Sequence, residues 1–283
     1  TYVLKTFYSL PVVCLVTDPD GLWNEQTGIF SAGEGIDVRQ YEGIPFKNPT
    51  PLYRKQKEAG VRVDAYAEMF HNETGETVFS QGVEFGLIGQ FSLDMPQKSL
   101  KVIAKARYGS KYINGKLFDD REFTQYRAFV LRNSGNDFYS SMCRDAFQQS
   151  IYAGTVDIDY QAYQPAIHFI NGEYYGIINI RERSNQHHVY SNWGYEKEEI
   201  DLVHNSASGG VALGDKVALN RLLELIDAGV TDRSYKEICT LLDVDEYINY
   251  IVAQSFSGNS DWMSNNVKFY RSRNNGLFRW ILY

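Results

Sequence analysis

Two apolar runs separated by an Asn-Gly pair constrain the fold of this chain more than any other local feature. The runs, residues 166–170 and 174–180, are joined by Asn171-Gly172-Glu173. An Asn-Gly pair between strand-forming runs is the strongest short-range signal for a β-hairpin, because both residues tolerate the positive φ that a type I′ turn requires. The sequence therefore predicts a β-hairpin in the middle of the chain, so the surrounding elements must be compatible with a sheet.

The sequence before this hairpin is rich in strand signals. Residues 61–71, for example, alternate apolar and polar side chains, which is typical of a half-buried strand. The predicted strands are residues 10–17, 61–71, 77–81, 83–88 and 99–106. One helix is predicted before the hairpin, because Met142, Ala146, Phe147 and Ile151 recur at helical spacing.

The sequence after the hairpin indicates helices and then a second hairpin. Residues 216–229 and 243–256 have amphipathic helical periodicity. Asp243 is a candidate N-cap of the second helix, with Glu246 three residues later in a variant of the capping box. Residues 267–271 and 278–283 are predicted strands that enclose a turn at Asn274-Asn275-Gly276.

Composition and charge narrow the class of protein. The chain has 283 residues, 43% of them hydrophobic, which is enough for a large core. Its formal net charge of −7 argues against nucleic acid as the main partner, because binding to nucleic-acid phosphates needs a basic surface. No apolar run approaches the ~20 residues of a membrane-spanning helix, so we expect no membrane span in this segment.

An acid and an amide lie five positions apart between the last predicted helix and the last hairpin. They are Asp261 and Asn266, in Gly258-Asn259-Ser260-Asp261-Trp262-Met263-Ser264-Asn265-Asn266. This is the layout of a kinase catalytic loop, in which the acid accepts the proton of the acceptor hydroxyl and the amide oxygen holds Mg²⁺ beside the phosphates. The alternative is that both residues only cap a helix or shape a turn, as Asp and Asn often do.

Further charged residues are candidates for a phosphate-binding region. Glycines at 82, 86 and 89 precede a lysine-bearing strand and resemble a phosphate-covering hairpin, with Lys98 as the nearest lysine. Asp145, on the predicted helix, is the candidate acid that orients this lysine, and Arg132 or Arg144 is the candidate source of additional positive charge. The alternatives are that the glycines mark strand bulges and that the charged side chains are solvated.

The strand that ends near Ile180 runs directly into Arg181-Glu182-Arg183. A strand that leaves a small lobe and crosses to a helical lobe is a hinge, whose backbone groups hydrogen-bond adenine in kinases. Arg181, Glu182 and Arg183 are therefore candidate nucleotide-binding residues.

Five blocks of sequence, in the same order along the chain, resemble the CotH (spore coat protein H) family of atypical protein kinases. The blocks are residues 10–30, 97–109, 131–145, 169–184 and 259–283. The resemblance implies a kinase-like fold, ATP binding, and divalent-metal-dependent phosphorylation of Ser or Thr on secreted or coat proteins, with Mg²⁺ or Mn²⁺ as the metal. It also implies an extracellular or cell-envelope location. By position, Asp261 matches the catalytic acid, Asn266 a metal ligand, and residues 181–183 the nucleotide hinge.

The chain departs from the family pattern in two places. Family members typically carry an arginine after the serine of the glycine-rich turn, where this chain has Leu93. The aspartate-rich metal motif of the family follows the strand that ends here at Tyr283. We therefore expect this segment to lack one metal ligand and to be inactive by itself.

These observations predict an α+β, protein-kinase-like two-lobed fold that is truncated at its C-terminus. The expected lobes are a strand-rich N-terminal lobe, residues 1–183, and a helical C-terminal lobe, residues 184–283. The expected activity is protein phosphorylation. Two alternatives remain open: an envelope module that binds carbohydrate or protein partners without catalysis, for which the 21 tyrosines and 4 tryptophans offer aromatic faces, and a structural coat component.

Overall fold

The computed structural model describes residues 8–37, 49–204, 210–263, 265–274 and 276–282, which form two compact units. The N-terminal unit contains the described residues of Thr1–Arg144 and Ala162–Glu182. The C-terminal unit contains those of Asp145–Gln161 and Arg183–Tyr283. The predicted lobe bounds, 1–183 and 184–283, stay a prediction. Residues 145–161 group with the C-terminal unit.

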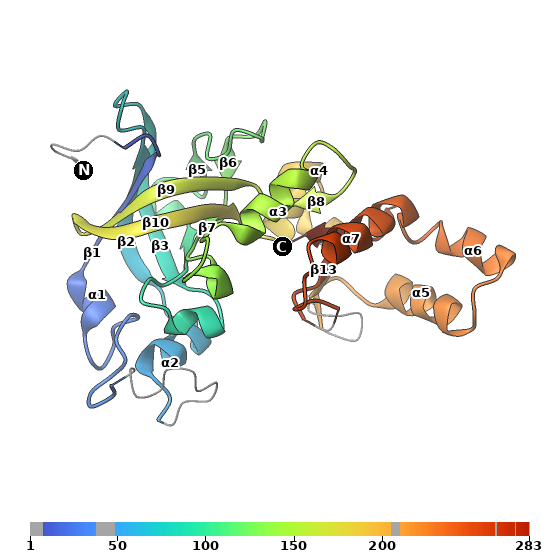
Figure 1. Cartoon of the computed structure of the whole chain (residues 1–283), viewed down its shortest axis with the longest axis horizontal. Helices are drawn as coiled ribbons and strands as arrows, with labels where there is room; N and C mark the ends of the chain where they lie inside the picture. The colour runs from blue at the N-terminus through green and yellow to red at the C-terminus, as the bar shows by residue number, and fades with distance from the viewer. Residues whose placement is uncertain (1–7, 38–48, 205–209, 264, 275, 283) are drawn as a thin grey trace. The chain divides into compact units, whose positions relative to one another are not determined.

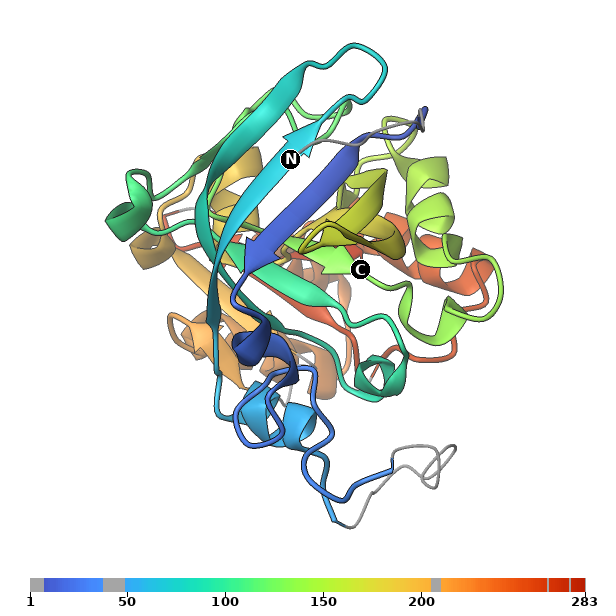
Figure 2. The same ribbon diagram turned by 90° about the vertical axis from the view of Figure 1, so that its left-hand side faces the viewer.

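Seven strands in the described part of the N-terminal unit close into a β-barrel (Figures 1 and 2). In chain order they are β1 (Val12–Thr17), β2 (Val63–Phe70), β3 (Thr77–Leu87), β4 (Leu100–Ile103), β7 (Ala128–Arg132), β9 (Tyr163–Ile170) and β10 (Glu173–Glu182). Around the barrel their order is β1-β2-β3-β4-β7-β10-β9. The parallel pairing of β1 with β9 closes the barrel, and the other neighbouring strands pair antiparallel. Closure removes the free sheet edges that would otherwise pair with other chains.

The predicted hairpin is formed by β9 and β10 and is confirmed. Asn171 and Gly172 have φ values of 51° and 84°, as a type I′ turn requires. A register shift between Tyr174 and Gly176 marks a β-bulge in β10. Gly176 has a φ of 119°, and a Cβ atom there would come within 2.8 Å of the Gln97 amide nitrogen. The positive φ therefore favours glycine at this position, and a side chain there would also require the Gln97 amide to move.

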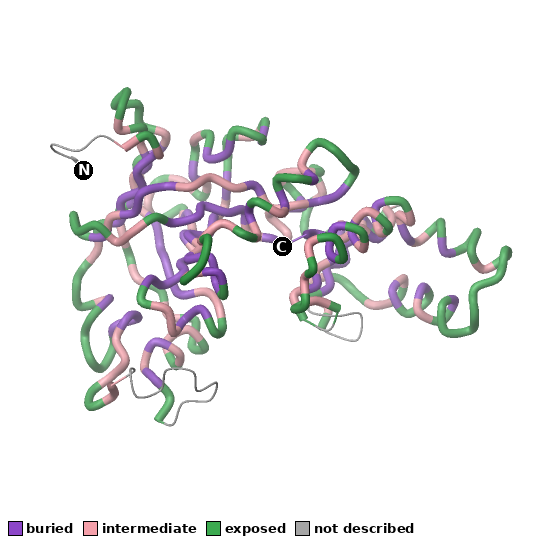
Figure 3. Tube along the Cα trace, in the orientation of Figure 1, coloured by how far each residue is buried: buried purple, intermediate pink, exposed green. Residues whose placement is uncertain are grey.

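The barrel surrounds a packed apolar core. Buried residues lie mainly along the strands, which also carry intermediate and exposed residues, and many of the connecting loops and turns are exposed (Figure 3). The buried core residues include Leu15, Phe85, Val102, Phe129 and Ile180. Burial of these apolar side chains provides the main driving force for folding this unit.

Short elements connect the barrel strands. They are α1 (Pro19–Trp23), α2 (Leu52–Glu58), η2 (Phe91–Asp94), η3 (Ala106–Tyr108), β5 (Ile113–Asn114), β6 (Gln125–Tyr126) and η4 (Gly135–Asp137). Strands β5 and β6 pair with each other as a separate two-stranded sheet.

The C-terminal unit contains a mixed sheet with the order β12-β11-β13-β14-β8. The strands are β8 (Asp159–Tyr160), β11 (Ile200–His204), β12 (Val211–Leu213), β13 (Lys268–Ser272) and β14 (Arg279–Leu282). The helices are α3 (Arg144–Tyr152), α4 (Gln186–Trp193), η5 (Lys197–Glu199), α5 (Val217–Asp227), α6 (Asp232–Ile238) and α7 (Val244–Phe256). Strands β13 and β14 form the predicted C-terminal hairpin; Asn275 and Tyr283 of that prediction lie outside the described residues. None of the helices within the described ranges is long and apolar enough to span a bilayer.

Helix α7 begins where the sequence predicts. The Asp243 carboxylate accepts a hydrogen bond from the backbone nitrogen of Glu246 at 3.2 Å, which confirms the N-cap. The C-terminal hairpin supplies part of the core of this unit, where the Phe269 and Trp280 rings stack with centroids 4.7 Å apart.

The predicted protein-kinase-like two-lobed fold is wrong. The N-terminal unit is a closed barrel, and the C-terminal unit is built on a five-stranded sheet in its described part rather than on helices alone. Two pairings account for the difference. Val12 pairs with Ile167 in the parallel contact that closes the barrel, and Val203 pairs with Phe269 in the second sheet. Both join residues far apart in sequence, which local periodicity does not specify.

Candidate functional site

The predicted catalytic loop lies between α7 and β13 and starts from a well-defined helix terminus. Gly258 has a φ of 59°, and its backbone nitrogen donates to the Ser255 carbonyl at 3.1 Å. The next backbone nitrogen, that of Asn259, donates to the Gln254 carbonyl at 3.1 Å. This pair of bonds is a Schellman motif, which satisfies the last carbonyls of the helix and sets the direction in which the chain leaves it.

Side chains then fix the first half of the loop. Asn259 accepts a hydrogen bond from the backbone nitrogen of Asp261 at 3.0 Å, and its amide donates to Gln254 at 2.7 Å. The buried Gln254 donates in turn to the Tyr250 hydroxyl at 3.0 Å. Trp262 packs edge-on against the Tyr250 ring, with centroids 5.9 Å apart. The position of Asp261 is therefore tied to the buried face of α7.

The structure brings Asp261 and Asn266 together, although the sequence guarantees only their spacing. The Asn266 amide donates to Oδ2 of Asp261 at 2.8 Å, and Asn265 donates to Oδ1 at 3.1 Å. Asp261 is exposed. An ionised carboxylate has about four acceptor positions, so these two bonds leave capacity for a substrate hydroxyl.

The donor atoms at this loop suit Mg²⁺ in type, and they account for only part of its ligand set. Mg²⁺ in kinases is held by one or two carboxylate or amide oxygens and completes its shell with phosphates and water. Asp261 and Asn266 offer one carboxylate and one amide within hydrogen-bonding distance. Among the described residues, no group of three or more His, Cys, Asp and Glu side chains could hold a metal by itself. A metal at this loop would therefore depend on phosphate oxygens for much of its coordination.

Lys268, which was not among the predicted site residues, contacts Ser184, the residue that follows the predicted hinge. Nζ of Lys268, the first residue of β13, donates to the backbone oxygen of Ser184 at 2.8 Å and to its hydroxyl at 2.9 Å. Burial, and to a smaller extent the positive charge of Arg183, lowers the pKa of Lys268 to about 8. On the adjacent strand, His204 is paired directly opposite Lys268. Burial and the charge of Lys268 lower the pKa of His204. The only sequence feature that could have indicated a role for Lys268 is its position two residues after Asn266.

The other two hinge residues point their side chains into the N-terminal unit. Arg181 is 1% exposed, and its guanidinium lies over the Tyr163 ring, 5.8 Å from the centroid. Glu182 accepts two hydrogen bonds from Arg121, at 2.7 and 3.0 Å, and one from the backbone nitrogen of Ala162 at 2.9 Å. These contacts support the barrel, and a role for either residue in nucleotide binding stays a prediction.

Lys98 is buried rather than solvated. Its Nζ donates to the carbonyl oxygens of Leu93 and Met95 at 2.5 and 2.8 Å and lies 4.4 Å from the centroid of the Tyr53 ring. The ammonium group thereby fixes the turn before β4. Its role as a phosphate ligand stays a prediction.

Arg132 and Asp145 belong to different units. The Arg132 guanidinium lies against Gly135 in the N-terminal unit, where a Cβ atom on that glycine would approach Nη2 to 3.1 Å. Asp145 lies at the start of α3 in the C-terminal unit, and its carboxylate accepts from the backbone nitrogen of Ala146 at 2.9 Å. Their proposed roles at the phosphates also stay predictions.

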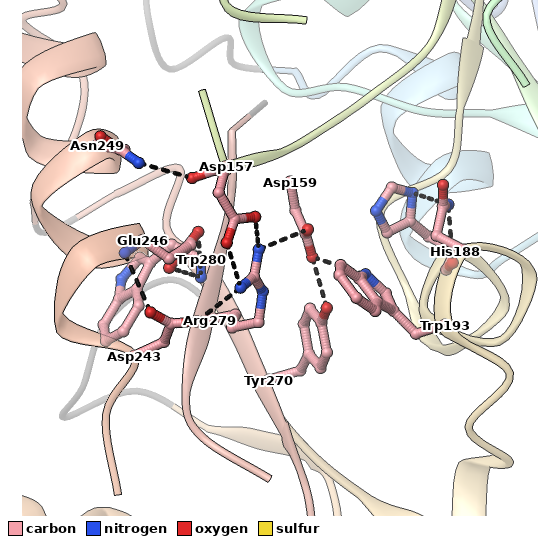
Figure 4. A network of polar contacts seen from close by, with 11 residues as sticks. Asp157, Asp159, His188, Trp193, Asp243, Glu246, Asn249, Tyr270, Arg279 and Trp280 are labelled. Atoms are coloured by element: carbon pink, nitrogen blue, oxygen red, sulfur yellow. Dashed lines mark hydrogen bonds and ion pairs between the residues drawn. The ribbon is translucent and has the colours of Figure 1, made fainter. Parts of the chain in front are cut away.

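A network of acids around Arg279 supports the elements that carry the loop (Figure 4). Arg279 of β14 contacts Asp157 at 2.5 Å, Asp243 at 2.7 Å and Asp159 at 3.5 Å. Asp159 also accepts from the Tyr270 hydroxyl at 2.5 Å. Because Asp243 caps α7 and Tyr270 lies in β13, the network holds together both elements that flank the loop. Sequence analysis identified only the capping role of Asp243.

Comparison with known protein families matches residues 87–283 to the family described as CotH kinase protein. The match covers more than half of the chain. The chain belongs to the CotH kinase family. The matched region includes the loop with Asp261 and Asn266, and also Lys268. A search of curated proteins finds no match. Membership in the CotH kinase family indicates a kinase-like function and, in general terms, the use of ATP and a divalent metal ion.

Proposed function

We propose that this CotH-family protein transfers the γ-phosphoryl group of ATP to a serine or threonine hydroxyl of a secreted or cell-envelope protein. The observation that carries the proposal is the exposed carboxylate of Asp261, held by the amides of Asn265 and Asn266 on a loop anchored at both ends. Family membership supports the kinase class. The net charge of −7 fits a protein substrate better than nucleic acid.

In this mechanism, Asp261 is the general base. Its carboxylate accepts the proton of the substrate hydroxyl as that oxygen attacks the γ-phosphorus, and the bond to the ADP oxygen breaks. The two amide bonds orient the carboxylate, which favours in-line attack because phosphoryl transfer depends mainly on positioning and electrostatics. Oδ1 of Asn266 is the protein atom that would hold a divalent ion. When bound, that ion neutralises charge on the phosphates.

The metal assignment is tested on the full-length protein with labelled ATP and a pool of secreted proteins as acceptors. Asn266→Ala should reduce transfer in Mg²⁺ about 10- to 100-fold, the size of effect seen when metal-ligand geometry is disturbed. Raising Mg²⁺ or substituting Mn²⁺ should restore part of the loss, because Mn²⁺ accepts similar oxygen ligands. Asn220→Ala, on α5, is the matched control and should transfer like wild type.

A loss in Asn266→Ala that neither metal relieves would overturn the ligand role and leave a loop-shaping role. If the wild-type protein neither transfers phosphate nor changes its melting temperature with millimolar Mg·ATP, the kinase proposal fails. A carbohydrate- or protein-binding role without catalysis would then be favoured.

A further inference from the structure

Tyr250, on the buried face of α7, is linked to the loop on both sides of Asp261. On the N-terminal side the link is a chain of hydrogen bonds. The Tyr250 hydroxyl accepts from the Gln254 amide at 3.0 Å, and Oε1 of Gln254 accepts from the Asn259 amide at 2.7 Å. On the C-terminal side, the Trp262 ring packs edge-on against the Tyr250 ring, with centroids 5.9 Å apart. Tyr250 is 1% exposed and Gln254 is 2% exposed, so both links start from closely packed side chains.

The directions of these hydrogen bonds fix which end of each amide faces the loop. Because the NH₂ group of Gln254 donates to the Tyr250 hydroxyl, the Gln254 oxygen faces Asn259. The NH₂ group of Asn259 donates to that oxygen, and the Asn259 oxygen accepts from the backbone nitrogen of Asp261 at 3.0 Å. A flip of either amide would place two donors or two acceptors opposite each other. The chain of hydrogen bonds therefore specifies one position for the backbone at Asp261.

We propose that Tyr250 and Gln254 are positioning residues, which hold Asp261 where its carboxylate can reach the substrate hydroxyl. This inference rests on the proposed phosphoryl transfer, and it gives a role in turnover to two side chains that are buried on α7. The amides of Asn265 and Asn266 orient the carboxylate itself, whereas the links to Tyr250 set the backbone from which the carboxylate projects. Turnover depends on such positioning, because a displacement of about 1 Å can lower it by about 100-fold.

Two substitutions of Gln254 separate positioning from a purely structural role. Gln254→Met removes both hydrogen bonds of the side chain, so turnover should fall about 10- to 100-fold. In Gln254→Glu, the new carboxyl group can accept from the Asn259 amide and from the Tyr250 hydroxyl, so both links survive. Its turnover should stay within a few-fold of wild type, although a buried carboxyl group lowers stability. Equal loss of turnover in the two variants would overturn the positioning role.

Turnover and the order of the loop are measured separately on the full-length protein, below the melting temperature of each variant. Amide hydrogen exchange followed by NMR reports on the hydrogen bond of the Asp261 backbone nitrogen and requires neither ATP nor an acceptor. Gln254→Met should speed exchange at this amide and leave the Kd of Mg·ATP within a few-fold of wild type. Asn249→Leu removes a different hydrogen bond of α7, to the Asp157 carbonyl at 3.0 Å, and is the matched control. It should keep the turnover and the Asp261 exchange rate of wild type.

The outcomes separate this inference from the proposed function. If folded Gln254→Met keeps wild-type turnover, or loses turnover while exchange at Asp261 stays slow, the positioning role is overturned and the kinase proposal is unaffected. If Gln254→Met does not fold, Tyr250→Phe decides the question, because it removes the hydroxyl and keeps the ring against Trp262. Its turnover should fall about 3- to 10-fold, the effect of losing one hydrogen bond, and unchanged turnover would overturn the role. If wild type transfers no phosphate but Gln254→Met speeds exchange at Asp261, the kinase proposal fails and the anchoring of the loop by Tyr250 and Gln254 stands.

Discussion

Both carboxylate oxygens of Glu246 lie 3.1 Å from the backbone nitrogen of Trp280, which donates to them from β14. The sequence predicted that Glu246 would complete a capping box at the start of α7. Its side chain instead crosses to the C-terminal hairpin, where it is completely buried. Burial raises the pKa of Glu246 to about 8, with Asp159 and Asp243 adding to the effect and Arg279 opposing it.

Glu246 should make the C-terminal unit less stable as pH rises. Its carboxyl group is protonated in the folded unit up to about pH 8, whereas in the unfolded chain it ionises near the ordinary glutamate pKa of 4.5. The stability that it contributes is therefore full below pH 4.5 and is lost between pH 4.5 and 8. Glu246→Gln should remove this loss and exceed wild type by on the order of 2–4 kcal/mol at pH 8.

Urea unfolding at a series of pH values, followed by tryptophan fluorescence, measures this difference. Trp193, Trp262 and Trp280 all lie in the C-terminal unit, so the signal reports mainly on it. Glu198→Gln, at an exposed position, is the control and should follow wild type. Parallel pH profiles for wild type and Glu246→Gln would contradict the assignment of the buried proton.

His168 should have the opposite effect on the barrel. The side chain is fully buried, and neither ring nitrogen has a hydrogen-bond partner among the described residues. Burial lowers the pKa of His168 to about 3, from the ordinary histidine value of 6.5. The stability that it contributes is full above pH 6.5 and is lost as pH falls toward 3, by at most about 1.4 kcal/mol per pH unit.

His168→Phe should therefore make the barrel less sensitive to acid than wild type. Hydrogen exchange of barrel amides between pH 4 and 7 measures the difference, after correction for the intrinsic exchange rate. His71→Phe, at an exposed position after β2, is the matched substitution and should keep the acid sensitivity of wild type. An unchanged pH profile in His168→Phe would show that this imidazole is not the acid-sensitive group.

Glu182 and Arg121 should behave as a coupled buried pair. Removing one partner leaves an uncompensated buried charge, so Glu182→Gln should destabilise the barrel by about 3 kcal/mol. Replacing both residues, as Arg121→Met with Glu182→Leu, should recover much of that loss. A double-mutant cycle by thermal unfolding measures the coupling. Additive effects of the two substitutions would exclude a structural pair and return Glu182 to consideration as a nucleotide ligand.

Elements specified by local sequence were predicted well. The β9–β10 hairpin follows from Asn171-Gly172, and α7 follows from its periodicity and the Asp243 cap. The pairing of Asp261 with Asn266 also lies within a short loop, so their spacing was informative. In each case the decisive contacts join residues at most a few positions apart.

Features that depend on long-range contacts were not predictable from these patterns. Lys268 and Ser184 are 84 residues apart, and only the folded sheet brings them together. Lys98 was predicted by its proximity to glycines, but its environment is set by the carbonyls of a preceding turn and by the Tyr53 ring. The closure of the barrel similarly depends on the pairing of β1 with β9. The residue pattern of each strand indicates that it is a strand, but it does not indicate which other strand it pairs with.

The most direct test of the account is the rate of phosphoryl transfer by Asp261→Asn in the full-length protein. A general base contributes about 10²- to 10⁴-fold, so we expect turnover to fall by that factor while Mg·ATP affinity stays within a few-fold of wild type. Asp227→Asn, which neutralises an exposed acid at the end of α5, should leave turnover unchanged. Wild-type turnover in a folded Asp261→Asn protein would contradict the account, because Asp261 would then only shape the loop.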